Sequence, residues 1–187
     1  MFFTITMILA LVTAIPAALL TARYNLHMFQ LMGYKNMEHV GWIRKNWKKQ
    51  ALLIPNGILG IVALICPHGV TMILLILWNL VLCKYYAYLR KSNTKKKLVY
   101  TMRVRRQVAT DVIVNGIILA LVWIFCGVNY VPGTAAVLIS LQMTALLLVN
   151  LVNRPAEKMI TNHFINDAKR MLKEVPGLTI IGITGSY

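Results

Sequence analysis

Acidic residues are scarce in this sequence, because five Asp and Glu residues stand against twenty Lys and Arg residues and only 13% of the 187 residues are charged. A soluble domain usually carries about a quarter charged residues. The scarcity of charge in a chain that is 58% apolar indicates a polytopic membrane protein. The basic excess does not indicate nucleic acid, since the basic residues flank apolar runs and no aromatic-interleaved basic groove accompanies them. We therefore expect no nucleic-acid partner.

Cysteine is scarce as well, and its positions exclude a disulfide framework. Cys66, Cys83 and Cys126 have no framework spacing and lie in or beside apolar runs, so we expect them to be small packing residues. Cys66 and His68 share a tight turn, but two possible ligands are too few for a metal site. The first apolar run lacks a basic leader and an Ala-x-Ala-type cleavage site, which indicates a retained membrane span.

Five apolar runs predict an all-α polytopic membrane domain over residues 1–153. The predicted spans are residues 2–21, 51–66, 70–84, 111–127 and 134–152. The second and third runs are short and meet at Cys66-Pro67-His68-Gly69, so they form either two crossings or one re-entrant hairpin. Thr110 or Asp111 can cap the fourth run.

Two basic segments lie between the runs. In the first, Asn36 is a plausible N-cap, and Val40, Ile43 and Trp47 follow at helical spacing among lysines and arginines. This pattern predicts an amphipathic helix on the membrane surface, with a solvated loop helix as the alternative. In the second segment, residues 90–106, apolar residues alternate from Leu98 onward, which predicts a short extended stretch. Anionic headgroups of the lipid bilayer are the expected partner of both segments.

Polar side chains within the predicted spans are amides. They are Asn56, Asn79, Asn115 and Gln142. Amides can hydrogen-bond between helices, each contributing about 1 kcal/mol. We expect no Asp, Glu, Lys or Arg at mid-depth, and this argues against an ion-coupled or proton-coupled transporter.

The distribution of basic residues predicts the orientation. If all five runs cross, the connections at residues 66–69 and 128–133 face one side and carry no Lys or Arg. All twenty basic residues then face the other side, which the positive-inside rule makes the cytoplasm. The N-terminus is expected outside and the C-terminus inside. If the second and third runs form a re-entrant hairpin, both termini are still expected on these sides.

The chain changes character after the fifth run. Pro155 fits the first position of a helix, and a linker helix is predicted within residues 154–177, with an apolar stripe that includes Ile160 and Phe164. His163 has no evident catalytic partner. A β-branched stretch from Leu178 then leads into a glycine turn, which is how a phosphate-binding loop begins.

Three stretches in this region resemble a known family. Asn153-Arg-Pro-Ala-Glu-Lys158, Phe164-Ile-Asn-Asp-Ala-Lys169 and Ile180-Ile-Gly-Ile-Thr-Gly-Ser-Tyr187 resemble membrane-anchored members of the Mur ligase family, of the UDP-N-acetylmuramoyl-tripeptide–D-alanyl-D-alanine ligase type. That family continues the loop as Gly-Ile-Thr-Gly-Ser-x-Gly-Lys-Thr/Ser. The residues that match its first half are Gly182, Thr184, Gly185 and Ser186.

The resemblance implies that residues 178–187 open the α/β ATP-binding domain of a ligase at a bacterial plasma membrane. It implies ATP and Mg²⁺ as cofactors of the intact parent, and UDP-MurNAc-peptide and D-Ala-D-Ala as substrates. The Gly-Lys-Thr/Ser half and the metal-binding carboxylates are missing, so we expect a front piece of a longer enzyme that does not itself bind ATP or catalyse. The alternatives are poly-γ-glutamate synthesis or muropeptide amidation within the same family, and a stand-alone small membrane scaffold or lipid carrier.

Overall fold

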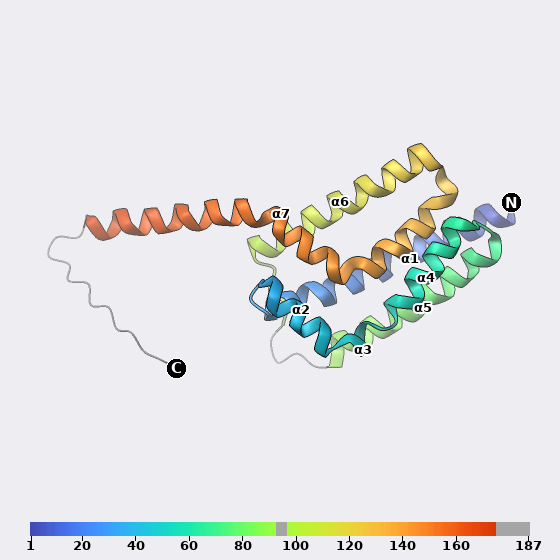
Figure 1. Ribbon diagram of the computed structural model, residues 1–187, viewed down its shortest axis with the longest axis horizontal. Coiled ribbons are helices and arrows are strands. Elements are labelled where there is room, and N and C mark those ends of the chain that lie inside the picture. Colours follow the sequence, from blue (N-terminus) through green and yellow to red (C-terminus); the bar gives the residue numbers. More distant parts are fainter. Residues whose placement is uncertain (93–96, 175–187) are drawn as a thin grey trace. The chain divides into compact units, whose positions relative to one another are not determined.

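The computed structural model describes residues 1–92 and 97–174, and in these two ranges all regular secondary structure is helical (Figure 1). The elements are α1 (Phe2–Leu31), α2 (Asn36–Lys45), α3 (Trp47–Gln50), α4 (Leu53–Ile65), α5 (Gly69–Ser92), α6 (Met102–Cys126), the short 3-10 helix η1 (Val128–Tyr130) and α7 (Val131–Lys173). The predicted strand from Leu178 and the glycine turn lie outside the described residues.

Five stretches of the described chain are helical, long and apolar enough to cross a membrane. They are α1, α3 together with α4 (Trp47–Ile65), α5 as far as Arg90, α6, and η1 together with α7. The prediction of a multi-pass all-α membrane domain is confirmed at this level. By length and composition, the two stretches that meet near Cys66 can each cross alone.

The helices extend beyond the predicted spans. α1 continues past Thr21 to Leu31 and ends before Gly33, whose φ of +64° is a left-handed conformation. α6 begins at Met102, nine residues before Asp111, and its N-cap is Thr101, whose hydroxyl accepts from the Val104 backbone N–H. The prediction of Asp111 as a cap was therefore wrong, and the predicted extended stretch is helical from Met102 onward.

Pro155 was also assigned wrongly as the first residue of a new helix. It lies inside α7, which runs without a break from Val131 to Lys173. Pro132 occupies the early position that suits proline in this helix, one residue after its start. A proline inside a helix removes one backbone hydrogen bond. The helix continues through Pro155 because the residues around it favour the helical conformation.

The first basic segment differs from a single surface helix. It forms α2 and α3, which are separated at Asn46, and the residue that precedes α2 is Lys35. Asn36 does not cap, because its side chain donates to the Leu147 carbonyl of α7 instead (3.3 Å). His39 and Gln50 are buried in the bundle, so this segment packs on its neighbours through polar as well as apolar groups.

The chain divides into two compact units, of which the first is Met1–Leu151 and the second begins at Val152. In the first unit α1 packs along α5. Small residues of α1, such as Ala10 and Ala17, are buried beside larger residues of α5 such as Leu75 and Leu82. Asn79 of α5 donates to the Thr13 hydroxyl of α1 at 3.3 Å, as expected for an interhelical amide.

A second close contact joins α4 to the first part of α7. A Cβ on Gly60 would lie 2.8 Å from the Gly133 carbonyl oxygen, and a Cβ on Gly133 would lie 2.8 Å from the Gly60 carbonyl oxygen. Glycine at both positions therefore lets the two backbones touch. Next to this contact Asn56 donates to the Ala136 carbonyl (2.8 Å) and to the Ser140 hydroxyl (3.1 Å). We call this contact the α4–α7 seam.

Candidate functional site: an apolar cavity between α1, α6 and α7

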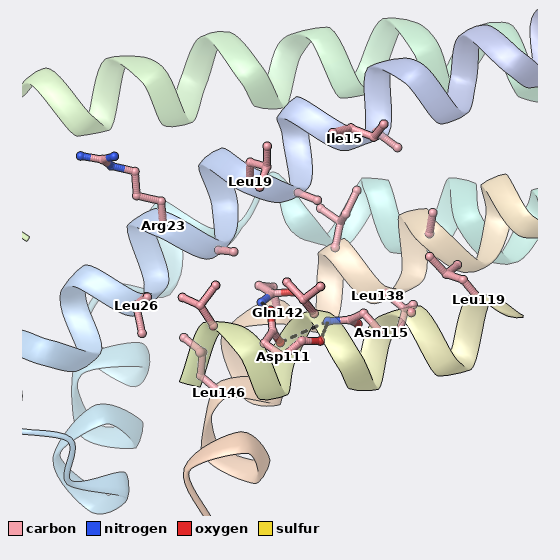
Figure 2. Close-up of a pocket in the computed structure, with 18 of the residues that line it drawn as sticks. Ile15, Leu19, Arg23, Leu26, Asp111, Asn115, Leu119, Leu138, Gln142 and Leu146 are labelled. Atoms are coloured by element: carbon pink, nitrogen blue, oxygen red, sulfur yellow. Dashed lines mark hydrogen bonds between the residues drawn. The ribbon is translucent and has the colours of Figure 1, made fainter. Parts of the chain in front are cut away.

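A cavity of about 530 Å³ lies within the first unit, between α1, α6 and the first part of α7, and it is open on one side, where Ile15, Leu19 and Val112 are more than half exposed (Figure 2). Its walls are almost entirely apolar, and its volume falls in the range of small-molecule sites, roughly 300 to 1,000 Å³. The apolar and glycine lining residues are Leu11, Ala14, Ile15, Ala18, Leu19, Ala22, Leu26, Val108, Val112, Gly116, Leu119, Ala135, Leu138, Ile139 and Leu146.

Small side chains on two walls create this space. Ala14, Ala18 and Ala22 recur every four residues on one face of α1, where longer side chains would reach toward α6. Gly116 of α6 faces open space, since a Cβ built on it meets no atom within 4 Å. The cavity therefore results from the sequence pattern of α1 and α6 and not from a single missing side chain.

Asp111 supplies a carboxylate to the α6 wall. The Gln142 side chain of α7 donates to one carboxylate oxygen at 2.7 Å, and the Asn115 side chain donates to the other at 3.1 Å. Figure 2 shows these three side chains meeting on one side of the cavity. Because each oxygen accepts an amide hydrogen bond, the buried carboxylate is compensated locally, and it joins α6 to α7.

A second polar connection joins the same helices. Gln107 of α6 donates to the Asn150 side-chain oxygen at 3.0 Å, and Asn150 donates to the Asn36 side-chain oxygen at 2.7 Å. Gln107 lines the cavity and is 1% exposed, and its side-chain oxygen has no hydrogen-bond partner. This buried oxygen is an unused acceptor beside the cavity.

One end of the cavity is basic. Figure 2 shows Arg23 toward one end of the α1 wall, with its side chain directed away from Asp111. Its guanidinium donates to the Tyr100 hydroxyl at 3.2 Å, and within the described ranges no carboxylate lies at ion-pair distance from it. Arg23 also lines a separate small hollow of about 30 Å³ between α1 and α5, together with His27 and Arg90. We call Arg23 and Tyr100 the basic rim.

His39 is a buried titratable group outside the cavity. Its ring stacks on Trp42 with centroids 5.6 Å apart and meets the edge of Phe29 at 4.9 Å. Neither ring nitrogen makes a hydrogen bond of ordinary geometry. Burial lowers the pKa of His39, and the backbone of Met143 opposes this only in part. The imidazole is thus held in its neutral form by its apolar surroundings.

The described residues do not test the predicted phosphate-loop site. Gly182, Thr184, Gly185 and Ser186 lie outside the described residues. Cys66 and His68 are exposed in the turn before α5, and the described part of the chain contains no group of three or more potential metal ligands. His163 is exposed on α7. The phosphate-loop prediction therefore stays a prediction.

Sequence reasoning named Asn115 and Gln142 as amides within the spans, but it did not bring them together with Asp111 at a cavity. Asp111 and Asn115 are four residues apart, a spacing that places them on one helix face. That spacing could have revealed the polar wall if the start of α6 had been placed correctly. The hydrogen bond from Gln142 to Asp111 joins residues 31 positions apart, and no local sequence pattern predicts it.

No protein-family model, curated protein or solved structure matches this chain.

Proposed function

We propose that this chain is the membrane-anchoring part of a Mur-type, ATP-dependent amide ligase. The observation that carries the proposal is the order of features: five helices that can span a membrane, then a basic helical segment to Lys173, then the Ile180-Ile-Gly-Ile-Thr-Gly-Ser186 stretch. A β-branched stretch that leads into a glycine turn is the usual entry to a phosphate-binding loop. The helices would hold that loop at a membrane surface.

The charges support a cytoplasmic position for the loop. The short connection before α5 and the connection through η1 carry no Lys or Arg, whereas the opposite ends of the helices and the segments beyond them carry all of them. The positive-inside rule then places the N-terminus outside, and the segment after Val152 in the cytoplasm of a bacterial cell. ATP and UDP-linked precursors are cytoplasmic compounds, so a ligase domain there would meet its substrates.

The proposed parent reaction is amide formation driven by ATP and Mg²⁺. The terminal carboxylate of UDP-MurNAc-tripeptide takes the γ-phosphoryl group of ATP and becomes an acyl phosphate, with release of ADP. The amine of D-Ala-D-Ala attacks the acyl carbon, phosphate leaves, and an amide bond forms. Gly182, Thr184, Gly185 and Ser186 would surround the ATP phosphates with backbone N–H groups. The lysine and hydroxyl contacts would come from residues after Tyr187.

The coding sequence after Tyr187 tests the ligase assignment directly. We expect Gly-Lys-Thr or Gly-Lys-Ser within three residues, followed by an open reading frame long enough for a substrate domain. Membranes that contain the full protein should then release phosphate from ATP only when Mg²⁺, UDP-MurNAc-tripeptide and D-Ala-D-Ala are all present. A reading frame without the lysine would refute the proposal, and turnover with glutamate or ammonia instead would assign a sister activity of the family.

Cysteine labelling tests the orientation. In a background with Cys66→Ser, Cys83→Ser and Cys126→Ser, a cysteine placed at Pro132, beside η1, should react with a membrane-impermeant maleimide added to intact cells. A cysteine at Lys97, before α6, should react only after the cells are opened. The reverse pattern would contradict the proposed topology while leaving the coding-sequence test unaffected.

A stand-alone lipid carrier is the second candidate function. The apolar cavity with a basic rim favours it, because a protein that only anchors a domain needs no such space. A stop codon directly after Tyr187 would support this candidate over the ligase.

A further inference from the structure

The cavity and its rim together have the form of an amphiphile site. The cavity is apolar along α1, α6 and α7, and its end is bordered by Arg23. The Arg23 guanidinium donates to the Tyr100 hydroxyl at 3.2 Å, and Tyr100 also lines the cavity. A ligand that fits the cavity and its Arg23 end needs a long apolar chain and a compact anionic head.

Phosphate is the head group that the rim chemistry favours. Guanidinium groups bind phosphate oxygens through short, charge-assisted hydrogen bonds. Arg23 donates to the Tyr100 hydroxyl and lies near no described carboxylate, so its remaining N–H groups can bind an anion. Basic pockets between transmembrane helices near the cytoplasmic side are known to bind lipid head groups.

The carboxylate on the opposite wall does not oppose this arrangement. Asp111 accepts hydrogen bonds from Gln142 and Asn115, and the Arg23 side chain is directed away from it (Figure 2). The head group at the rim would therefore lie apart from the carboxylate.

We propose that the cavity between α1, α6 and α7 binds a membrane lipid with a phosphate head group, its chain within the cavity and its phosphate at Arg23. This role goes beyond the proposed function and does not depend on it. An anchor for a ligase and a stand-alone lipid carrier could both use such a site.

Photo-crosslinking of the full chain in phosphatidylcholine nanodiscs tests the proposal. The probe is hexadecyl phosphate with a diazirine in its chain, compared with hexadecyl phosphocholine and hexadecanol that carry the same group. We expect the phosphate probe to label the protein about tenfold more than either comparison probe, the effect of one or two charge-assisted hydrogen bonds. The labelled peptides should come from α1, α6 and the first part of α7. Inorganic phosphate should not compete, because it lacks the chain.

Two matched pairs of variants separate the site from general lipid contact. Gly116→Leu fills the cavity, whereas Gly41→Leu adds the same side chain in α2, where a Cβ also meets no atom within 4 Å. Arg23→Gln removes the rim charge, whereas Arg44→Gln removes an exposed charge of α2. Labelling should fall about tenfold in Gly116→Leu and Arg23→Gln and should stay unchanged in the two controls. Ala22→Leu is a second cavity-filling variant, to be used if Gly116→Leu does not fold.

Three results would overturn the proposal. The first is equal labelling by the three probes. The second is unchanged labelling in folded Gly116→Leu or Ala22→Leu. The third is full competition by inorganic phosphate, which would indicate an anion site without a lipid chain. None of these results bears on the coding sequence after Tyr187, so the ligase proposal succeeds or fails separately.

Discussion

The first part of α7 has two sides that are packed in opposite ways. Toward α4, Gly133 meets Gly60 with the backbones in contact, and Asn56 donates across the seam. Toward α1 and α6, the same helix borders a cavity of about 530 Å³. The side toward α4 buries small residues and interhelical amides. The side toward α1 and α6 leaves a cavity beside the Asp111 carboxylate and the Gln107 side-chain oxygen. The comparison suggests that the seam maintains the fold and that the cavity serves a ligand.

The attachment of α6 explains why the cavity persists. The buried residues of α6 are Val104, Gln107 and Asp111, all in its first half. Its second half is exposed, including Trp123 and Phe125, as expected for a helix face in contact with lipid. Polar pairs near its start therefore hold α6 to α7, and no close packing draws its second half toward α1.

A glycine-to-leucine substitution made on each of the two sides should give the largest difference in stability between two variants. Gly60→Leu forces a side chain against the Gly133 carbonyl, so it should destabilise the protein by about 3 kcal/mol or more and can prevent folding. Gly116→Leu enters open space and should change stability by less than about 1 kcal/mol. Thermal unfolding in detergent measures both. Equal losses in the two variants would show that the seam and the cavity are packed alike.

The sequence predicted the membrane helices because apolarity over about twenty residues is a local property. It predicted the interhelical role of Asn56 and Asn79 for the same reason, since a polar group in an apolar span needs a partner. The ends of the helices were predicted less well, because Arg23 and Arg103 are charged but do not break a helix. The cavity could not be predicted, because it depends on how far α6 lies from α1.

The carboxylate link between α6 and α7 should have the next largest effect. Asp111→Ala leaves the Gln142 and Asn115 amides without their acceptor and should cost about 1 to 3 kcal/mol. Asp111→Asn keeps one acceptor oxygen and should cost less. A double-mutant cycle with Gln142→Leu, followed by thermal unfolding, should give a coupling energy of about 1 kcal/mol. A coupling energy near zero would mean that this pair does not hold α6 in place.

His39 adds a pH dependence to the closely packed part of the bundle. Burial lowers its pKa, so the unfolded chain binds a proton more readily than the folded chain. The stabilisation is fully present above about pH 6.5 and is lost as the pH falls through the lower folded-state pKa. Unfolding temperatures measured across this range should fall more steeply with acid for the wild type than for His39→Phe. Parallel profiles would show that His39 titrates as it does in the unfolded chain.

Removal of an exposed ion pair should have the smallest effect on the free energy of unfolding, and it serves as a reference for the other variants. Lys35 and Glu38 are 2.9 Å apart at the start of α2, and both side chains are largely exposed. Glu38→Gln should change the free energy of unfolding by less than about 1 kcal/mol, and salt should reduce the difference further. A larger change would mean that α2 is held to the bundle through this surface and not through Asn36 and His39.

The most direct test of the contrast between the two sides is a crystal structure grown from a lipidic phase with hexadecyl phosphate added. The account predicts continuous density for a chain between α1, α6 and α7 that ends at Arg23, with Gly60 and Gly133 still in backbone contact. A structure in which α6 lies against α1, Gly116 is enclosed by side chains and no space remains would contradict it.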